Sequence, residues 1–215
     1  RKNIKNFCGK PLIFWTIEAA IKASGIDRII LSTEDHEIAE ICSQYKEVEI
    51  PFMRPNDLAE DTSIAIDTYI YTIENLRKEQ SLHYSDFVVL LPTSPLRSSK
   101  DIDKAIDIFI NKDADSVIGC RELEFPRNWI LDINHQGKIY KESKHKELSN
   151  RQDNREIHIP NGSIYILNYE KIKKHRTYYF DNSYAYIMPS HRSVDIDTAE
   201  DFHYAEYLKR KIDDR

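Results

Sequence analysis

Two aspartates near the C-terminal end of the sequence have the spacing of a metal site. Asp195 and Asp197 stand in the run Val-Asp-Ile-Asp-Thr at residues 194–198. In an extended segment, residues two apart point to the same side, so both carboxylates would face one ligand. Mg²⁺ takes one or two such carboxylates and completes its shell with water and phosphate oxygens. Helix capping by Asp197 or Thr198 is the competing interpretation, but it leaves Asp195 unexplained.

A second candidate is the polar loop at residues 92–97, which reads Pro-Thr-Ser-Pro-Leu-Arg. Two prolines stiffen this loop, two hydroxyls are free to hydrogen-bond, and a guanidinium closes it. A rigid polar loop of this kind suits a nucleotide. The alternative is a proline-rich turn in which Ser98 or Ser99 caps the next helix.

Two further segments carry weaker signals. Arg54 precedes residues 58–63, Leu-Ala-Glu-Asp-Thr-Ser, just ahead of a predicted helix. The start of a helix favours an anion, although a simple N-cap has the same composition. Residues 160–166 place an amide and a glycine, Asn161 and Gly162, at the head of a predicted strand, where an ordinary turn would look the same.

The elements that must position these residues alternate between helix and strand. Helical periodicity is found at residues 11–23, 33–45, 63–80, 100–112 and 198–211, and short apolar runs at residues 28–32, 48–50, 87–91, 116–120, 162–167 and 184–188. This order predicts an α/β fold, a three-layer α/β/α sandwich around a mainly parallel sheet, with residues 1–215 forming a single domain. Function is expected in the loops that leave the carboxyl ends of the strands.

Residues 121–160 interrupt this alternation. The stretch is polar and contains one hairpin-like piece at residues 129–140, which is expected to turn at Gln136 and Gly137. We interpret it as an excursion inserted into the α/β domain.

Composition excludes several classes of protein. The formal charge of −5 argues against general nucleic-acid binding, which needs a surplus of Lys and Arg. No apolar run approaches the roughly 18 residues of a spanning helix, and no signal-peptide pattern opens the sequence, so we expect no membrane partner and a cytoplasmic location. The three cysteines include no C-x-x-C pair and the histidines no metal-ligand spacing, which leaves carboxylates as the metal ligands.

Taken in order, the motifs resemble those of the acylneuraminate cytidylyltransferases, that is, the CMP-sialic acid synthetases and their relatives. The likeness runs along nearly the whole sequence, at residues 1–4, 9–12, 30–33, 54–55, 58–59, 61–62, 92–97, 151–152, 160–166, 195–198 and 201–202. The resemblance implies a Rossmann-like nucleotidyltransferase fold. It also implies that CTP and an acidic nine-carbon sugar are the substrates, that a CMP-sugar and pyrophosphate are the products, and that Mg²⁺ is the cofactor.

The resemblance further implies roles for individual positions. Asp195 and Asp197 would hold Mg²⁺ and act in catalysis together with Lys2. The nucleotide would be contacted by Asn3, Arg54, Ala59, Thr62, Ser63, Pro92, Thr93 and Ser94. The acidic sugar would be received by Arg97, Arg151, Gln152, Asn161, Tyr178 and Tyr179. Residues 121–160 would be the dimerisation excursion, through which two subunits of a homodimer exchange contacts.

Three departures from the family pattern affect these expectations. Upstream of Lys2 the family carries a strand and a basic loop that grips the triphosphate, so we expect such a piece to precede this sequence. Leu91 stands where sialic acid synthetases typically present a glutamine, and Ile159 stands where some place an arginine. Loss of a polar contact to the sugar changes substrate choice more than reaction type. The sugar is therefore expected to be N-acetylneuraminate, legionaminate, pseudaminate or a similar nonulosonate.

Two other functions compete with this interpretation. A CMP-KDO synthetase is a related cytidylyltransferase, but residues 160–166 and the pair Asp195 and Asp197 weigh against it. A non-catalytic nucleotide- or sugar-binding protein belongs to another class, and retention of both aspartates weighs against that one.

Overall fold

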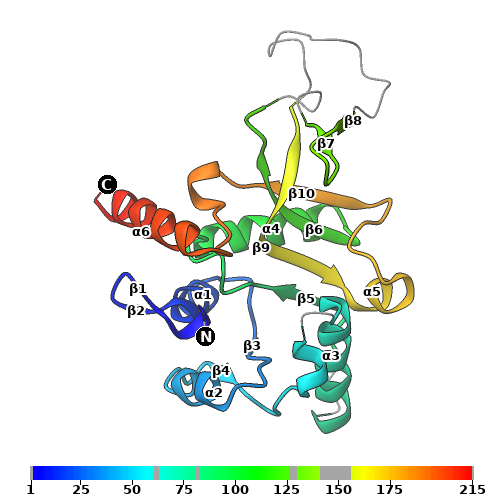
Figure 1. The fold of residues 1–215 in the computed structure, drawn as a ribbon. Coiled ribbons are helices and arrows are strands. Elements are labelled where there is room, and N and C mark those ends of the chain that lie inside the picture. The colour runs from blue at the N-terminus through cyan, green and yellow to red at the C-terminus, as the bar shows by residue number, and fades with distance from the viewer. Residues whose placement is uncertain (1, 61–62, 81–82, 126–129, 141–155, 215) are drawn as a thin grey trace.

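The computed structural model describes residues 2–60, 63–80, 83–125, 130–140 and 156–214. Its central layer is a four-stranded sheet with the order β10, β6, β9, β5 (Figure 1). The strands are β5 (Asp86–Val89), β6 (Ser116–Glu122), β9 (His158–Asn168) and β10 (Ser183–Ile187).

The direction of β9 departs from the mainly parallel sheet that the sequence predicts. β10 runs parallel to β6, whereas β9 is antiparallel to both β6 and β5. β9 follows β6 in the chain and lies directly beside it, an arrangement typical of an antiparallel pair because no crossover helix is needed. The sheet is therefore mixed, and the reversal brings the start of β9 to the edge where β5, β6 and β10 end.

A second, smaller sheet lies beside the first. It consists of β3 (Ile29–Ile30) and β4 (Val48–Glu49), which pair in parallel. Between β3 and β5 lies a cleft of about 480 Å³, whose apolar wall includes Ile13, Leu31 and Val88. The cleft thus separates the edges of the two sheets.

Helices cover both faces of the four-stranded sheet. One layer contains α1 (Leu12–Ile21) and α4 (Ser99–Asn111), and the other contains α3 (Ala65–Gln80) and α5 (Tyr169–His175). Successive side chains of β9 point to opposite faces, so Ile164 packs in the first layer and Leu167 in the second. The predicted three-layer α/β/α sandwich is confirmed.

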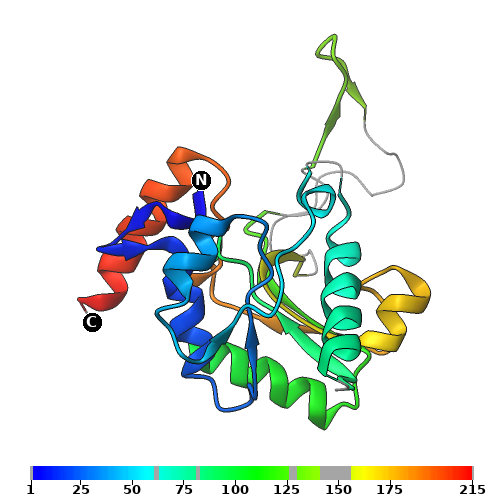
Figure 2. The ribbon, with the colours of Figure 1, turned by 90° about the horizontal axis from the view of Figure 1, so that it is seen from below.

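The last helix, α6 (Ala199–Asp213), lies along the hairpin of β1 (Asn6–Phe7) and β2 (Lys10–Pro11) in both views (Figures 1 and 2). The ring centroids of Phe7 and Phe202 are 5.4 Å apart in an edge-to-face contact. This packing brings Lys2, in the 3-10 turn that precedes β1, to the segment that precedes α6.

The local sequence explains where two of the helices begin. α2 (His36–Cys42) starts later than predicted because the Asp35 side chain accepts hydrogen bonds from the amides of Glu37 and Ile38. The short helix α5 was not predicted, although Asn168 caps it by accepting from the Lys171 amide. The described helices include none that is long and apolar enough to cross a membrane.

The predicted hairpin in the excursion is present. Its strands are β7 (Asp132–Ile133) and β8 (Ile139–Tyr140), and Gly137 takes a positive φ of 78° in the turn. The hairpin projects away from the three-layer body (Figure 2).

Candidate functional site

Three of the motifs found in the sequence meet at one edge of the four-stranded sheet. The loop after β5 is tied to the segment after β10 by a hydrogen bond of 2.9 Å from the Ile196 amide to the Thr93 carbonyl. The head of β9 is tied to the same segment by a hydrogen bond of 3.0 Å from Asn161 Nδ2 to Ser193 Oγ. Residues 92–97, 160–166 and 194–198 therefore form one continuous surface.

The carboxylate of Asp195 lies against the backbone of Gly162. A Cβ atom added at Gly162 would stand 2.6 Å from Asp195 Oδ2. The other oxygen, Oδ1, is buried and has no hydrogen-bond partner among the described residues. A buried carboxylate oxygen without a protein donor needs a cation or a water molecule, and Mg²⁺ is a cation of the right kind.

Asp197 is exposed and faces Lys2. Lys2 Nζ lies 3.3 Å from Asp197 Oδ1 and also donates to the Ile196 carbonyl. The helix cap that competed with the metal interpretation is made by Thr198, which forms a capping box with Asp201 at the start of α6. Neither Asp195 nor Asp197 provides the capping side chain, so both carboxylates remain available to a ligand.

The donor set fits a magnesium ion that is shared with a substrate. Among the residues that the structure describes, there is no group of three or more His, Cys, Asp or Glu side chains arranged around a metal position. Two carboxylates completed by water and phosphate oxygens are the ordinary surroundings of Mg²⁺ in proteins that bind nucleotides. Asp195 and Asp197 would hold it.

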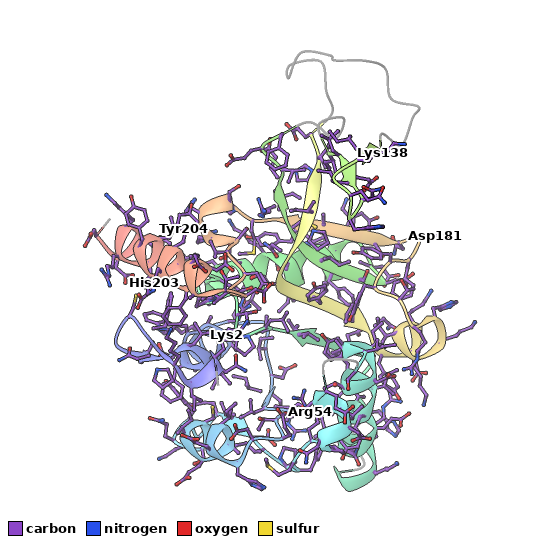
Figure 3. The ribbon with its side chains drawn as sticks, viewed as in Figure 1. Lys2, Arg54, Lys138, Asp181, His203 and Tyr204 are labelled. Carbon is purple, nitrogen blue, oxygen red and sulfur yellow. The ribbon has the colours of Figure 1, made fainter. Side chains whose placement is uncertain are left out.

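Several residues expected to contact the nucleotide line the cleft between β3 and β5. Asn3, Arg54 and Pro92 are among its lining residues, together with Thr33 and Glu34. The Arg54 guanidinium forms an ion pair with Glu34, and its Nε is buried without a partner in the described structure. Figure 3 shows Lys2 close to α1 and Arg54 close to α3.

The remaining predicted nucleotide contacts are placed less directly. Ala59 ends the 3-10 turn Asn56–Ala59 and is exposed, and Ser63 Oγ donates to the Asp57 carbonyl at 2.5 Å. Ser94 is buried, and its hydroxyl has no partner among the described residues. Thr62 lies outside the described residues.

Arg97 was predicted to contact the sugar, and the structure places it in the interior instead. Its side chain is 3 % exposed, with Nη1 donating to the Ser163 carbonyl at 2.5 Å and Nη2 to Thr16 Oγ1 at 2.7 Å. Burial lowers the pKa of this guanidinium below its usual value, with the nearby Asp101 carboxylate acting in the opposite direction. Arg97 thus joins α1 to β9 beneath the site and does not point to a ligand.

Replacing Arg97 by methionine is expected to lower the free energy of unfolding by about 3 kcal/mol, because the carbonyl and hydroxyl that it satisfies would stay buried without a donor. Urea unfolding measures this loss. The control is Arg176→Met, since Arg176 is exposed and pairs with Asp67 at the surface. If Arg97→Met unfolds like the control, Arg97 returns to the list of possible sugar contacts.

Asn161 is likewise a buried residue rather than an open sugar contact. Besides holding Ser193, it accepts a hydrogen bond of 3.1 Å from the Ser163 amide. The prediction assigned it to the sugar from the family resemblance, and a sequence pattern does not reveal which partners a buried amide has.

An aromatic group that includes one of the two predicted tyrosines lies on the face covered by α3. The ring of Tyr178 stands 5.3 Å from that of Tyr165 and 6.5 Å from that of Tyr69, while Tyr179 is exposed. Burial raises the pKa of Tyr165, and the neighbouring Tyr178, Tyr179 and Asp195 raise it further. The Tyr165 hydroxyl therefore lies near enough to the Asp195 carboxylate for the two to interact electrostatically. The sequence pattern did not mark Tyr165 as a site residue. Arg151 and Gln152 lie outside the described residues.

Comparison with known proteins gives one family. The family model described as cytidylyltransferase matches residues 1–213. A CMP-N,N'-diacetyllegionaminic acid synthase of Legionella pneumophila is 31% identical over 208 residues, which cover 96% of this chain and 88% of that protein. A pseudaminic acid cytidylyltransferase of Campylobacter jejuni is 29% identical, covering 97% of this chain and 89% of that protein.

A further relative agrees with this family, and a solved structure agrees with the fold. An N-acylneuraminate cytidylyltransferase of Streptococcus agalactiae is 30% identical over 94% of this chain, which spans 48% of that longer protein. The fold is similar to that of a CMP:2-keto-3-deoxy-manno-octonic acid synthetase in complex with CTP, with a TM-score of 0.69, 13% identity and coverage of 98% of this chain and 92% of that one. The chain therefore belongs to the cytidylyltransferase family.

Proposed function

We propose that the protein transfers CMP from CTP to an acidic nine-carbon sugar of the nonulosonate class and releases pyrophosphate. The observation that carries this proposal is the Asp195 carboxylate, whose buried oxygen has no partner among the described residues, beside the exposed pair of Asp197 and Lys2. Family membership supplies the reaction type.

The chemistry asks the protein mainly to position its substrates and to neutralise charge. The anomeric hydroxyl of the sugar attacks the α-phosphorus of CTP in line and gives up its proton to water, the bond to the β-phosphate oxygen breaks, and pyrophosphate leaves. When bound, Mg²⁺ supplies neutralising charge at the phosphates. Asp195 and Asp197 would hold it, and the ammonium group of Lys2, which pairs with Asp197, would add a second positive charge beside it.

The cytidine end of the substrate is assigned to the polar side chains Asn3 and Arg54 rather than to the apolar gap between β3 and β5. Asn3 offers an amide, and Arg54 a guanidinium whose Nε has no partner in the described structure.

The sugar is assigned to the nonulosonates because the similar proteins named above act on legionaminic, pseudaminic or N-acylneuraminic acid. Leu91 lines the cleft, and Ile159 is half-buried at the head of β9. Apolar side chains at these two positions offer no hydrogen bond to a sugar hydroxyl, which favours a nonulosonate that differs from N-acetylneuraminate at the groups they face.

Pyrophosphate release from CTP and Mg²⁺ tests this function, with N-acetylneuraminate, legionaminate, pseudaminate and KDO offered in parallel to the intact protein. Release with one nonulosonate establishes the reaction and identifies the sugar. Release with KDO alone would show the related CMP-KDO synthetase activity. If folded protein that binds CTP releases no pyrophosphate with any of the four sugars, it is a nucleotide-binding protein without this activity.

We also propose that the excursion mediates a homodimer. The excursion carries exposed apolar side chains, with Ile130, Leu131, Ile133 and Ile139 on or beside its hairpin and Phe125 ahead of it. Exposed apolar groups gathered on a projecting element are typical of a protein interface. Figure 3 shows Lys138 on this same projection, far from Lys2 and Arg54.

Changing Ile133 to glutamate is expected to shift the protein from dimer to monomer in sedimentation velocity, because a charge would be buried in the apolar interface. Ile110→Glu is the matched control: Ile110 is 67% exposed on α4, and Ile133 is 62% exposed on the hairpin. A wild-type protein that sediments as a monomer at all concentrations would contradict the proposal.

A further inference from the structure

Gly162 stands at the point where β9 meets the site. Its φ is +70°, and a Cβ added there would lie 2.6 Å from Asp195 Oδ2 and 3.2 Å from Asp195 Cγ. Carbon and oxygen atoms without a bond do not approach to 2.6 Å, so any side chain at position 162 would displace the Asp195 carboxylate.

The backbone around this contact is held on both sides. Ser193 accepts a hydrogen bond from Asn161 at 3.0 Å, and the Ile196 amide donates to the Thr93 carbonyl at 2.9 Å. β9 is paired with β6 at residues 158–160 and with both β5 and β6 from residue 165 onward, so the ladder holds the strand on either side of Gly162, where the register shifts. Because both segments are fixed, the short side chain of Asp195 is the part that yields when the space at position 162 is filled.

We propose that Gly162 is a positioning residue, which seats the Asp195 carboxylate by leaving room for it. The inference deepens the proposed function, since Asp195 is the residue assigned there to the metal and the phosphates. The seating itself is a property of the free protein and needs neither nucleotide nor metal.

A simpler reason for a glycine at this position is its positive φ, which costs any other residue strain. Gly9 and Gly137 separate the two reasons. Their φ angles are +94° and +78°, and a Cβ added to either meets nothing within 4 Å. Alanine at position 9 or 137 therefore has the backbone strain but makes no contact with a carboxylate.

Thermal unfolding of the metal-free and nucleotide-free protein tests the seating directly. Gly162→Ala is expected to lower the unfolding temperature by several degrees more than Gly9→Ala or Gly137→Ala. In an Asp195→Ala background the clash is gone. Gly162→Ala should then lower the unfolding temperature only as much as Gly9→Ala or Gly137→Ala does. The proposal is overturned if Gly162→Ala behaves like the controls in the wild-type background, or if its extra effect persists without the Asp195 side chain.

Turnover gives a second measurement. Gly162→Ala is expected to reduce the rate of pyrophosphate release roughly 100-fold, the effect of misplacing a catalytic group by about an ångström, while Gly9→Ala retains the wild-type rate. Equal rates for the two variants would overturn the positioning role. If the wild-type protein releases no pyrophosphate but the unfolding cycle behaves as described, the proposed function fails and the seating of Asp195 stands.

Discussion

Asp195→Asn is expected to reduce pyrophosphate release by about 100-fold or more, with the largest loss at low Mg²⁺ concentration. Asparagine keeps the size of the side chain and removes its charge, so the buried oxygen loses its attraction for a cation. Charge stabilisation by a bound metal is worth several kcal/mol, and each 1.36 kcal/mol corresponds to about tenfold in rate. Initial rates measured across a series of Mg²⁺ concentrations give both the loss and its dependence on the metal.

Asp197→Asn is expected to have a smaller effect, because Asp197 is exposed and already faces Lys2 at 3.3 Å. Asp213→Asn serves as the control, since Asp213 is exposed at the C-terminal end of α6, where it pairs with Lys209. Full turnover in Asp195→Asn would remove this residue from the metal site. Full turnover in Asp197→Asn alone would show that Asp195 is the only one of the two carboxylates that the metal requires.

Asp101→Asn is expected to destabilise the protein by about 2 to 3 kcal/mol at neutral pH, less than a fully buried ion pair because Arg192 keeps partial contact with solvent. Asp101 is 1% exposed. Its oxygens accept from Arg192 Nη2 at 2.6 Å, from the Tyr186 hydroxyl at 2.7 Å and from Ser98 Oγ at 2.6 Å. An amide cannot accept all of these donors, so some would stay buried without an acceptor.

The effect has a defined pH dependence. Burial acts to raise the pKa of Asp101, but the hydrogen bonds from Arg192, Ser98 and Tyr186 outweigh it and hold the pKa below its ordinary value. A carboxyl group whose pKa is lower in the folded state stabilises the protein above its unfolded pKa, about 3.9, and this stability is lost as the pH falls through the folded pKa.

Urea unfolding at several pH values therefore tests both the size of the stability loss and its dependence on pH. The difference between wild type and Asp101→Asn should be largest near pH 7 and should shrink below about pH 4. Asp107→Asn is the control, since Asp107 lies on the exposed side of the same helix. A difference that stays constant down to acid pH would show that the ionised carboxylate contributes nothing.

The sequence predicted the layers of this fold well because apolar periodicity reflects which faces are buried. The helix at residues 100–112 and the strand at residues 116–120 match α4 and β6 closely. The direction of β9 was beyond reach, because strand direction depends on which neighbour a strand joins, and an apolar run such as residues 162–167 looks alike in both directions.

The residues of the site were likewise predictable only in part. The pair Asp195 and Asp197 was recognisable as a candidate metal site because its i, i+2 spacing has geometric meaning by itself, and its role at a metal stays a prediction. The roles of Arg97 and Asn161 were not, because each depends on partners far away in the sequence, Ser163 and Thr16 for the first and Ser193 for the second. A polar side chain beside a site either contacts a ligand itself or supports the backbone that does. These two roles differ in how deeply the side chain is buried, which the sequence does not show.

The reversed strand β9 also has a consequence for how the protein folds. It pairs with β5 and β6, which lie well upstream in the sequence, and its first residues support Asp195. Pairings between distant segments close large loops and form slowly. The seat of Asp195 is therefore complete only once β9 has paired with β5 and β6, so recovery of pyrophosphate release during refolding would report on the assembled sheet rather than on the helices alone.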